Sequence, residues 1–265
     1  MKDTIVVVPA FNEARTIAAV LAGICARMPE RVIVVDDGSD DGTAARVREL
    51  IASGRSSCPV ELIRHTANRG KGFALASGIA RALDAGARRI VTIDGDGQHD
   101  SADLPRLAQV AALEPTAIVI AARTRDRDQA PPLRRFANEV ADFWISWACG
   151  RRIGDTQSGF RLYPADALAH LNTRPRRGNG FAFETELLID LVDAGAGVRS
   201  VPIATRYEPD ARASHYRPWR DTWSIIRLVG RRLLRRGMYP RGLLRVLARE
   251  RAEGRGRALS LRDSD

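Results

Sequence analysis

The sequence predicts an α/β fold in which helices flank a mainly parallel β-sheet. Three observations lead to this prediction. Short runs of valine and isoleucine recur along the chain, segments with helical spacing of apolar residues separate them, and polar residues follow each run directly. Strands that alternate with helices pair in parallel, and such sheets bind their ligands at the carboxyl ends of the strands. We therefore expect the functional residues along one edge of the sheet.

The first half of the chain supplies most of the expected sheet. Its apolar runs are short and wholly apolar, as in strands that are covered on both faces. Between them, apolar residues recur every three or four positions, as on the buried face of a helix. The expected strands are residues 5–8, 31–35, 60–63, 89–93 and 117–121, and the expected helices lie near residues 17–24, 47–51, 73–83 and 103–113.

The second half is less regular. We expect a helix over residues 133–149, a polar loop over residues 150–159 and a second helix over residues 181–192. Residues 198–203 have the composition of a strand. Pro202 places this strand near an edge of the sheet, because proline has no N–H to donate to a neighbouring strand.

The composition is that of a basic globular protein. With 265 residues, of which 45% are hydrophobic, the chain can form a substantial core, and a disordered protein is excluded. The formal net charge is +10, and arginines crowd the sequence from Arg212 onward, which indicates a polyanionic partner such as nucleic acid, acidic lipid headgroups or phosphates. No apolar stretch approaches the roughly 18–20 residues that span a bilayer, and the first residues lack a signal-peptide pattern. We therefore do not expect the chain to cross a membrane by itself.

The cysteines bear on the compartment. Cys25, Cys58 and Cys149 are odd in number and widely spaced. This spacing shows neither a disulfide framework nor a metal-binding pattern. A reducing cytosol is therefore the simplest compartment.

Residues 219–236 form an amphipathic pattern. On a helix, one side carries apolar residues and another side carries arginines. A bilayer with anionic lipids suits such a helix, because apolar side chains insert between headgroups that attract the arginines. Packing on the preceding α/β domain with a solvated basic face is an equal alternative. The apolar side comprises Trp219, Trp223, Ile226, Val229 and Leu233, and the basic side Arg220, Arg227 and Arg231.

Two acids end the fourth expected strand. Asp94 and Asp96 are separated by Gly95, and Gly97 follows, so the backbone can turn sharply beside a ligand. Carboxylates this close repel each other unless a cation lies between them, and hard oxygen ligands suit Mg²⁺ or Mn²⁺. We interpret the motif as a metal–diphosphate site. The alternative for this motif alone is a solvated acidic turn.

Five motifs follow one another along the chain, at residues 7–13, 34–43, 68–72, 94–99 and 155–161. Any one of these motifs is weak evidence, but the ordered set over residues 4–205 is specific. Together they resemble the motifs of the family-2 glycosyltransferases of GT-A fold, in the branch of the dolichyl-phosphate mannosyltransferases and bacterial polyprenyl-phosphate glycosyltransferases. The resemblance implies an inverting hexosyltransferase that uses a nucleoside-diphosphate sugar of the GDP-mannose or UDP-glucose type.

The resemblance also implies a donor site. Its residues would line the nucleotide pocket, contact the base or ribose, and meet the diphosphate at the start of a helix. At the base or ribose contact Asp36 is an alternative to Asp37, and a capped turn explains either residue without a ligand. The implied nucleotide-sugar residues are Pro9, Ala10, Phe11, Glu13, Asp37, Lys71, Asp94 and Asp96, and the implied ligands of Mg²⁺ or Mn²⁺ are Asp94, Asp96 and Gln98.

On the acceptor side the resemblance implies residues that bind a lipid-linked phosphate. Arg123, with Arg134 or Arg135, matches the family's phosphate-binding arginines, and a solvated basic loop is the alternative. A phosphate acceptor is already ionised and needs little help from a base, whereas a hydroxyl acceptor needs a carboxylate such as Asp155, Glu184 or Glu186. The remaining acceptor residues are Gln157, Ser158 and Arg161, and the implied catalytic set is Asp96, Asp155, Arg123, Arg161 and Glu184.

Two departures from the family leave alternatives open. The Gln-x-x-Arg-Trp element of many hydroxyl-acceptor relatives has no clear copy, and the membrane-spanning C-terminal helices of many polyprenyl-phosphate enzymes are replaced by residues 219–236. We expect a polyprenyl-phosphate acceptor, with a hydroxyl on a lipid or secondary metabolite as the alternative. A sugar nucleotidyltransferase and a nucleic-acid binder fit the motifs less well.

The expected organisation follows from these motifs. Residues 1–210 would form the catalytic domain, with a nucleotide-sugar half to about residue 122 and an acceptor half from about residue 123. Residues 211–249 would form a basic helical extension, and residues 250–265 a disordered tail. We expect a cytoplasmic enzyme, peripheral at the inner face of the cytoplasmic membrane.

Overall fold

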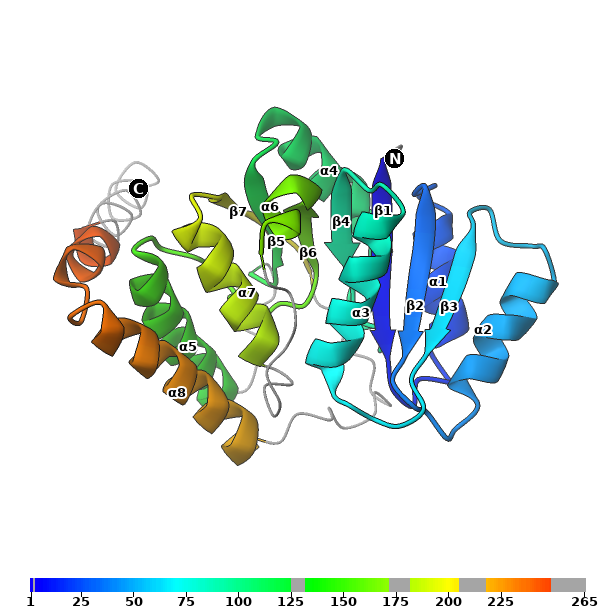
Figure 1. Cartoon of the computed structure of the whole chain (residues 1–265), viewed down its shortest axis with the longest axis horizontal. Coiled ribbons are helices and arrows are strands. Elements are labelled where there is room, and N and C mark those ends of the chain that lie inside the picture. Colours follow the sequence, from blue (N-terminus) through cyan, green and yellow to red (C-terminus); the bar gives the residue numbers. More distant parts are fainter. Residues whose placement is uncertain (2, 125–131, 172–181, 205–217, 249–265) are drawn as a thin grey trace, which may run out of the picture.

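A seven-stranded mixed sheet forms the centre of the protein, whose computed structural model describes residues 1, 3–124, 132–171, 182–204 and 218–248 (Figure 1). The strand order is β3-β2-β1-β4-β6-β5-β7, and β6 runs antiparallel to its neighbours β4 and β5 while the other pairs are parallel. The strands are β1 (Thr4–Ala10), β2 (Arg31–Asp36), β3 (Val60–Arg64), β4 (Arg89–Thr92), β5 (Ala117–Ala122), β6 (Arg161–Pro164) and β7 (Gly197–Pro202).

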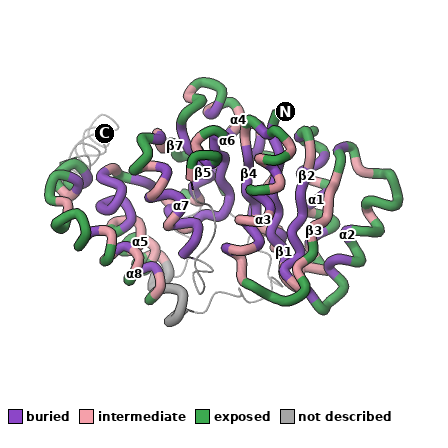
Figure 2. The backbone as a smooth tube through the Cα atoms, in the orientation of Figure 1, coloured by how far each residue is buried: buried purple, intermediate pink, exposed green. Residues whose placement is uncertain are grey.

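Helices cover both faces of the sheet (Figure 1). Side chains alternate between the faces along each strand, so neighbouring residues of β1 enter different cores. Ile5 and Val7 pack with α3 (Lys71–Asp84), whereas Val6 and Val8 pack with α1 (Ile17–Cys25) and α4 (Leu104–Leu113). Figure 2 shows the resulting buried band through the sheet. Burial on both sides is the reason why these strands are wholly apolar.

Helix α3 lies directly on the sheet. Gly78 permits this approach, because a Cβ there would overlap Cγ1 of Val7. The packing fixes the N-terminal end of α3, and with it Lys71, beside the carboxyl ends of the central strands. The remaining helices are α2 (Thr43–Ala52), the 3-10 turn η1 (Ser101–Asp103), α5 (Pro132–Cys149), α6 (Ala165–Ala169), α7 (Ala182–Asp193) and α8 (Pro218–Arg235), and residues 240–248 are also helical.

Helices α5, α7 and α8 pack against one another on the side of the molecule where β5 and β7 lie (Figure 1). Val229 and Leu233 of α8 are buried in this group, whereas Trp223 and Ile226 are exposed. The predicted apolar side of α8 is thus divided between packing and solvent. The side chains of Trp219 and Arg220 and the expected tail 250–265 lie outside the described residues. None of the described helices is long and apolar enough to cross a membrane.

The structure confirms the predicted sheet and adds two features. Strand β7 lies at an edge, as Pro202 indicated, but β6 was not predicted because its four residues include a charged residue and a proline.

The expectation that the cysteines form no disulfide is wrong. Cys25, at the end of α1, and Cys58, just before β3, are joined by a disulfide with their Cα atoms 5.2 Å apart, and Cys149 is a buried free thiol. The fold brings together two positions 33 residues apart, which spacing alone does not reveal.

Candidate active site

The site lies where the parallel strands β1, β2, β4 and β5 end. Ala10 pairs with Asp36 at the ends of β1 and β2, and the N–H of Asp37 donates to the carbonyl of Ala10 at 2.9 Å. Just past β4, the N–H of Ile93 donates to the carbonyl of Val7 at 3.1 Å. The residues after each strand therefore share one edge of the sheet, as the sequence predicted.

Lys71 links Asp94, in the turn after β4, to Glu184 of α7. Nζ of Lys71 lies 2.7 Å from Oδ1 of Asp94 and 2.9 Å from Oε2 of Glu184, which is in the first turn of α7. Burial alone would lower the pKa of Lys71, but the two carboxylates outweigh it and raise that pKa. Burial would likewise raise the pKa of Asp94, but Lys71 outweighs it and lowers that pKa. Lys71 and Asp94 are therefore both charged at neutral pH.

Asp96 is in a different electrostatic state. Its Oδ1 accepts the backbone N–H of Gln98 at 3.0 Å, and Oγ1 of Thr16 donates to the carbonyl of Gly95 at 2.7 Å, so the turn is held from two sides. Burial, together with the charge of Asp94, raises the pKa of Asp96 to about 6. Negative charge at Asp96 is thus costly in this site without a further cation.

The donor atoms of this turn fit a divalent cation. Asp94 and Asp96 supply hard carboxylate oxygens, and the raised pKa of Asp96 reports charge that such an ion would neutralise. Within the described residues no group of three histidine, cysteine or acidic side chains is placed to hold a metal. A cation here would therefore take further ligands from water or a diphosphate, as Mg²⁺ and Mn²⁺ commonly do.

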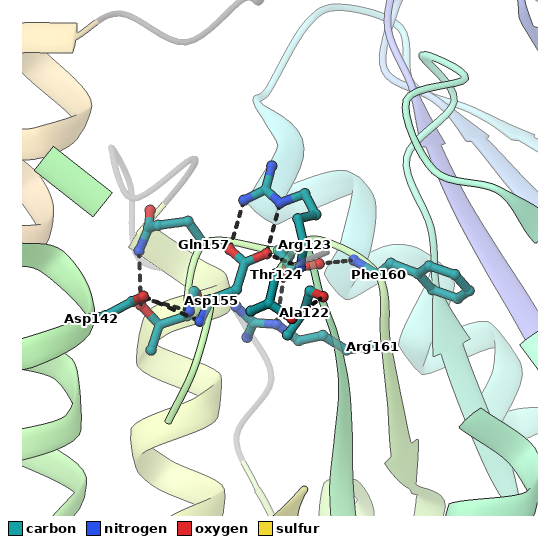
Figure 3. A network of polar contacts seen from close by, with 10 residues as sticks. Ala122, Arg123, Thr124, Asp142, Asp155, Gln157, Phe160 and Arg161 are labelled. Atoms are coloured by element: carbon teal, nitrogen blue, oxygen red, sulfur yellow. Dashed lines mark hydrogen bonds and ion pairs between the residues drawn. The ribbon is translucent and has the colours of Figure 1, made fainter. Parts of the chain in front are cut away.

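On the acceptor side, an arginine–aspartate pair joins the end of β5 to the loop 155–161 (Figure 3). Nε and an Nη of Arg123 each lie 2.7 Å from a different oxygen of Asp155, and the backbone N–H of Arg123 donates to Oδ2 at 2.7 Å. Burial would raise the pKa of Asp155, but the hydrogen bonds from Arg123 outweigh it and lower that pKa. Asp155 is therefore ionised and a weak base.

Asp142 of α5 holds the same loop from the opposite side (Figure 3). Its carboxylate accepts the N–H of Asp155 at 3.2 Å, and both the N–H and the hydroxyl of Thr156 at 2.7 Å. The backbone of Asp155 has a positive φ of 52°, which is uncommon for a residue other than glycine. These three hydrogen bonds hold the loop in that conformation.

Arg161 is fully buried under the loop. Its guanidinium donates to the carbonyls of Ser158 at 2.8 Å, Thr156 at 2.6 Å and Glu184 at 2.8 Å. The carbonyls satisfy the donors of a buried cation that the sequence assigned to catalysis and acceptor binding. Arg161 thus ties the loop to the start of α7, next to the acid that pairs with Lys71.

Gly159 brings the two halves into contact. Its carbonyl accepts the hydroxyl of Thr92 at 2.9 Å. A Cβ at this position would lie 2.6 Å from Oδ2 of Asp94 and 2.8 Å from Nζ of Lys71. The backbone of the loop 155–161, called the acceptor loop after its predicted role, therefore passes directly against Asp94, and a Cβ at Gly159 would require a neighbouring side chain or the loop to move.

The nucleotide-side residues occupy the other end of this edge. Pro9 and Ala10 are buried at the end of β1, and Phe11 and Glu13 follow at intermediate exposure. The carboxylate of Asp37 accepts N–H groups of Arg69 at 3.1 Å and Gly70 at 2.6 Å. Asp37 therefore holds the loop that leads into Lys71, which is a sufficient structural role, and a contact with base or ribose stays a prediction.

Comparisons with known proteins agree with this architecture. The chain matches the profile of Glycosyl transferase family 2 over residues 5–172, which contain the five motifs and both halves of the site except Glu184. The chain belongs to glycosyl transferase family 2. As a family-2 glycosyltransferase it is an enzyme, and the mixed sheet with its flanking helices is the GT-A fold.

Individual relatives fit the same assignment. The UDP-N-acetylglucosamine–dolichyl-phosphate N-acetylglucosaminyltransferase of Methanococcus voltae is 28% identical over 213 residues, 76% of this chain and 84% of the relative. The undecaprenyl-phosphate mannosyltransferase of Micrococcus luteus is 27% identical over 201 residues, 74% of this chain and 81% of the relative. Glucosyl-3-phosphoglycerate synthase from Mycobacterium tuberculosis, crystallised with Mn²⁺, UDP and phosphoglyceric acid, is similar with a TM-score of 0.61 at 26% identity, over 88% of this chain and 78% of that chain.

The site of this family-2 glycosyltransferase gathers most of the predicted residues, with some exceptions. Arg135 lies part-exposed on α5, and the side chain of Arg134 is outside the described residues. Ser158 is buried, and its hydroxyl accepts the N–H of Phe160 at 3.3 Å. Gln157 donates to the hydroxyl of Thr156 at 3.4 Å.

Sequence reasoning missed the residues that hold the site together. Asp142 and Thr16 lie outside the motifs, and His65 pairs with Asp37 at 2.6 Å from a strand end that carried no motif. Burial lowers the pKa of His99 to about 4, so this residue of the fourth motif is neutral. His99 and Gly159 had a signal in the sequence, since they stand inside the fourth and fifth motifs.

Proposed function

We propose that this enzyme transfers a hexose from a nucleoside-diphosphate sugar of the GDP-mannose or UDP-glucose type to a polyprenyl phosphate, with inversion of configuration. One observation carries the proposal. Gly159 sets the acceptor loop against Asp94, so the acids suited to the donor diphosphate and the arginine suited to the acceptor phosphate share one site. The names of the relatives that use dolichyl-phosphate and undecaprenyl-phosphate support the acceptor class.

The donor half would bind and orient the nucleoside diphosphate. Pro9, Ala10, Phe11 and Glu13 would line the nucleotide pocket at the end of β1. Asp94 and Asp96, with Gln98 in the same turn, would hold Mg²⁺ or Mn²⁺, which supplies electrostatic stabilisation of the leaving diphosphate. The relative crystallised with Mn²⁺ and UDP supports this use of a cation.

The acceptor half would bind an anion that needs no deprotonation. Arg123 would present its guanidinium to the acceptor phosphate, with Asp155 fixing its orientation through two hydrogen bonds of 2.7 Å. Of the three acids considered as bases for a hydroxyl acceptor, Asp155 is paired with Arg123 and Glu184 with Lys71. The hydrogen bonds from Arg123 outweigh burial, lower the pKa of Asp155 and make it a weak base, which favours a phosphate over a hydroxyl acceptor.

The acceptor class also suggests where the enzyme works. A polyprenyl phosphate resides in a bilayer, and α8 carries exposed Trp223 and Ile226 beside exposed Arg227 and Arg231. We propose a peripheral association with the inner face of the cytoplasmic membrane through residues 219–236.

A transfer assay with two matched acceptors tests the proposal. Labelled UDP- and GDP-sugars are offered with Mn²⁺ or Mg²⁺ and either undecaprenyl phosphate or undecaprenol, which differ only in the phosphate. We expect product with the phosphate alone and none after chelation by EDTA. Product with undecaprenol alone would replace the acceptor assignment, and the absence of both transfer and nucleotide binding would refute the whole proposal.

A further inference from the structure

Two exposed apolar stripes lie on α5 and α8. On α5, Phe136, Val140 and Trp144 are spaced four residues apart and therefore follow one side of the helix. Phe136 is 64% exposed. On α8, Trp223, Ile226 and Leu234 follow one side in the same way, and they are 62%, 52% and 69% exposed. Large apolar residues arranged in stripes on a surface indicate an interaction site.

The helices that carry the two stripes are in contact at their C-terminal ends. Trp144 stacks on Trp147 with ring centroids 5.1 Å apart, and Nε1 of Trp147 donates to the carbonyl of Tyr239, just past α8, at 3.2 Å. Arg236 donates to the carbonyl of Ala148 at 3.1 Å. The C-terminal ends of α5 and α8 are thus joined, and Figure 1 shows the helices side by side.

The arginines of α8, with Arg236 directly after it, divide into two groups. Arg232 forms ion pairs with Asp190 and Asp193 of α7, and Arg236 lies 2.9 Å from Asp193. These arginines are neutralised on the packed side of the helix. Arg227, Arg231 and Arg235 are exposed, and Arg227 follows Trp223 by one helical turn. The exposed apolar stripe of α8 is therefore bordered by positive charge.

We propose that the stripes of α5 and α8 form one docking surface for an anionic lipid bilayer, which we call the two-helix surface (Phe136, Val140, Trp144, Trp223, Ile226 and Leu234). Apolar side chains bordered by arginines suit acyl chains beneath acidic headgroups. A second copy of this chain is a poorer partner, because two such surfaces would bring their arginines together. The membrane association through α8 was part of the proposed function, and the inference adds α5 as an equal part of the surface.

Helix α5 also links this surface to the acceptor loop. Asp142, which holds Asp155 and Thr156, lies two residues from both Val140 and Trp144. Two residues correspond to about 200° around a helix, so Asp142 is on the opposite side of α5 from the stripe. The acceptor loop is therefore about one helix diameter, roughly 10 Å, from the proposed bilayer contact. The phosphate of a polyprenyl phosphate would therefore need to rise only about 10 Å above the bilayer contact to reach this loop. This conclusion rests on the proposed function.

Flotation of the full-length protein with vesicles tests the inference. Phe136→Glu and Trp144→Glu place charge in the α5 stripe, and Leu113→Glu is the matched control at an 84% exposed leucine of α4. We expect binding to vesicles with phosphatidylglycerol to weaken about tenfold in each α5 variant and to be unchanged in the control. Arg227→Gln with Arg231→Gln should weaken it too, with Arg48→Gln as control. Thermal melting establishes that each variant is folded.

The outcomes separate this inference from the proposed function. Undiminished binding of both α5 variants would overturn the inference, whatever the activity. Transfer to a short, water-soluble isoprenyl phosphate should be unchanged in the α5 variants, and its absence in the wild-type protein would count against the proposed function alone. A dimer that the α5 variants dissociate while vesicle binding persists would assign the surface to a second copy and also overturn the inference.

Discussion

Gly159 lies so close to Asp94 that a Cβ on residue 159 would be 2.6 Å from Oδ2 of that acid. The contact joins the acceptor loop to the turn that we assign to the metal. A methyl group added at Gly159 would therefore push the loop and Asp94 apart, and this can be tested directly.

The Gly159→Ala substitution should reduce transfer at least about tenfold, since it must move either Asp94 or the loop, and a loss of that size corresponds to about 1.4 kcal/mol. Overpacking should also lower the free energy of unfolding by about 1–3 kcal/mol. Steady-state kinetics and urea denaturation measure both effects. Gly154→Ala is the control, because a Cβ there meets only Oγ of Ser200 at 3.9 Å and neither glycine has a positive φ. Equal activities of the two variants would contradict the assignment of this contact.

The metal assignment predicts a loss of nucleotide binding without a loss of folding. Asp96→Asn removes a carboxylate whose pKa is raised to about 6 by burial and by Asp94. Relief of this repulsion should leave the free energy of unfolding unchanged or slightly higher. Calorimetry with UDP or GDP and Mn²⁺ should detect no binding to the variant, and transfer should fall below detection. Binding equal to that of the wild-type protein would refute the role of Asp96.

The ion pairs of Lys71 should be strongly coupled. Lys71→Met leaves the carboxylates of Asp94 and Glu184 together in a buried site, so we expect a destabilisation of about 3–5 kcal/mol. Glu184→Gln keeps the pair with Asp94 and should cost less. The double variant should be less destabilised than the sum of the two, and urea denaturation of all four proteins measures the coupling. Simple additivity would mean that Lys71 and Glu184 do not interact in solution.

The pair of Asp155 with Arg123 predicts how stability depends on pH. The pKa of Asp155 in the folded protein is lower than the ordinary carboxyl pKa of about 4. Its contribution to the free energy of unfolding is therefore fully present above about pH 4 and is lost as the pH falls through the lower folded-state pKa. Asp155→Asn should therefore cost roughly 1–3 kcal/mol at pH 7. Denaturation curves of both proteins should converge as pH falls below about 4. A constant difference across this range would exclude a charged pair.

The cysteines should differ in reactivity. Burial raises the pKa of Cys149 to about 12, so its thiol should not react with a thiol reagent in the native protein near neutral pH. Without reductant, the unfolded chain should show one thiol, because Cys25 and Cys58 are bonded, and after reduction three. Three thiols in the unreduced, unfolded chain would restore the expectation from the sequence.

The strands and the motifs could be predicted because their signals are local. Wholly apolar runs such as Ile5–Val8 and the acids that follow β4 need no knowledge of distant residues. The residues that organise the site depend on contacts across the chain. Asp142 reaches a loop 13 and 14 residues later, and Arg161 meets α7 23 residues later, with no pattern that marks either partner. The resemblance implies ligand-binding roles for Arg161 and Asp37, and the fold adds contacts of both side chains with backbone groups of the protein itself.

Strand β6 runs between β4 and β5, antiparallel to both. The chain from Arg123 to Phe160 is consequently one continuous segment that joins the end of β5 to the start of the adjacent strand β6. An insertion, deletion or exchange within that segment leaves the strand connections of residues 1–122 unchanged. The proposed acceptor side could therefore be re-engineered by grafting one continuous segment, provided that the contact between Gly159 and Asp94 is kept.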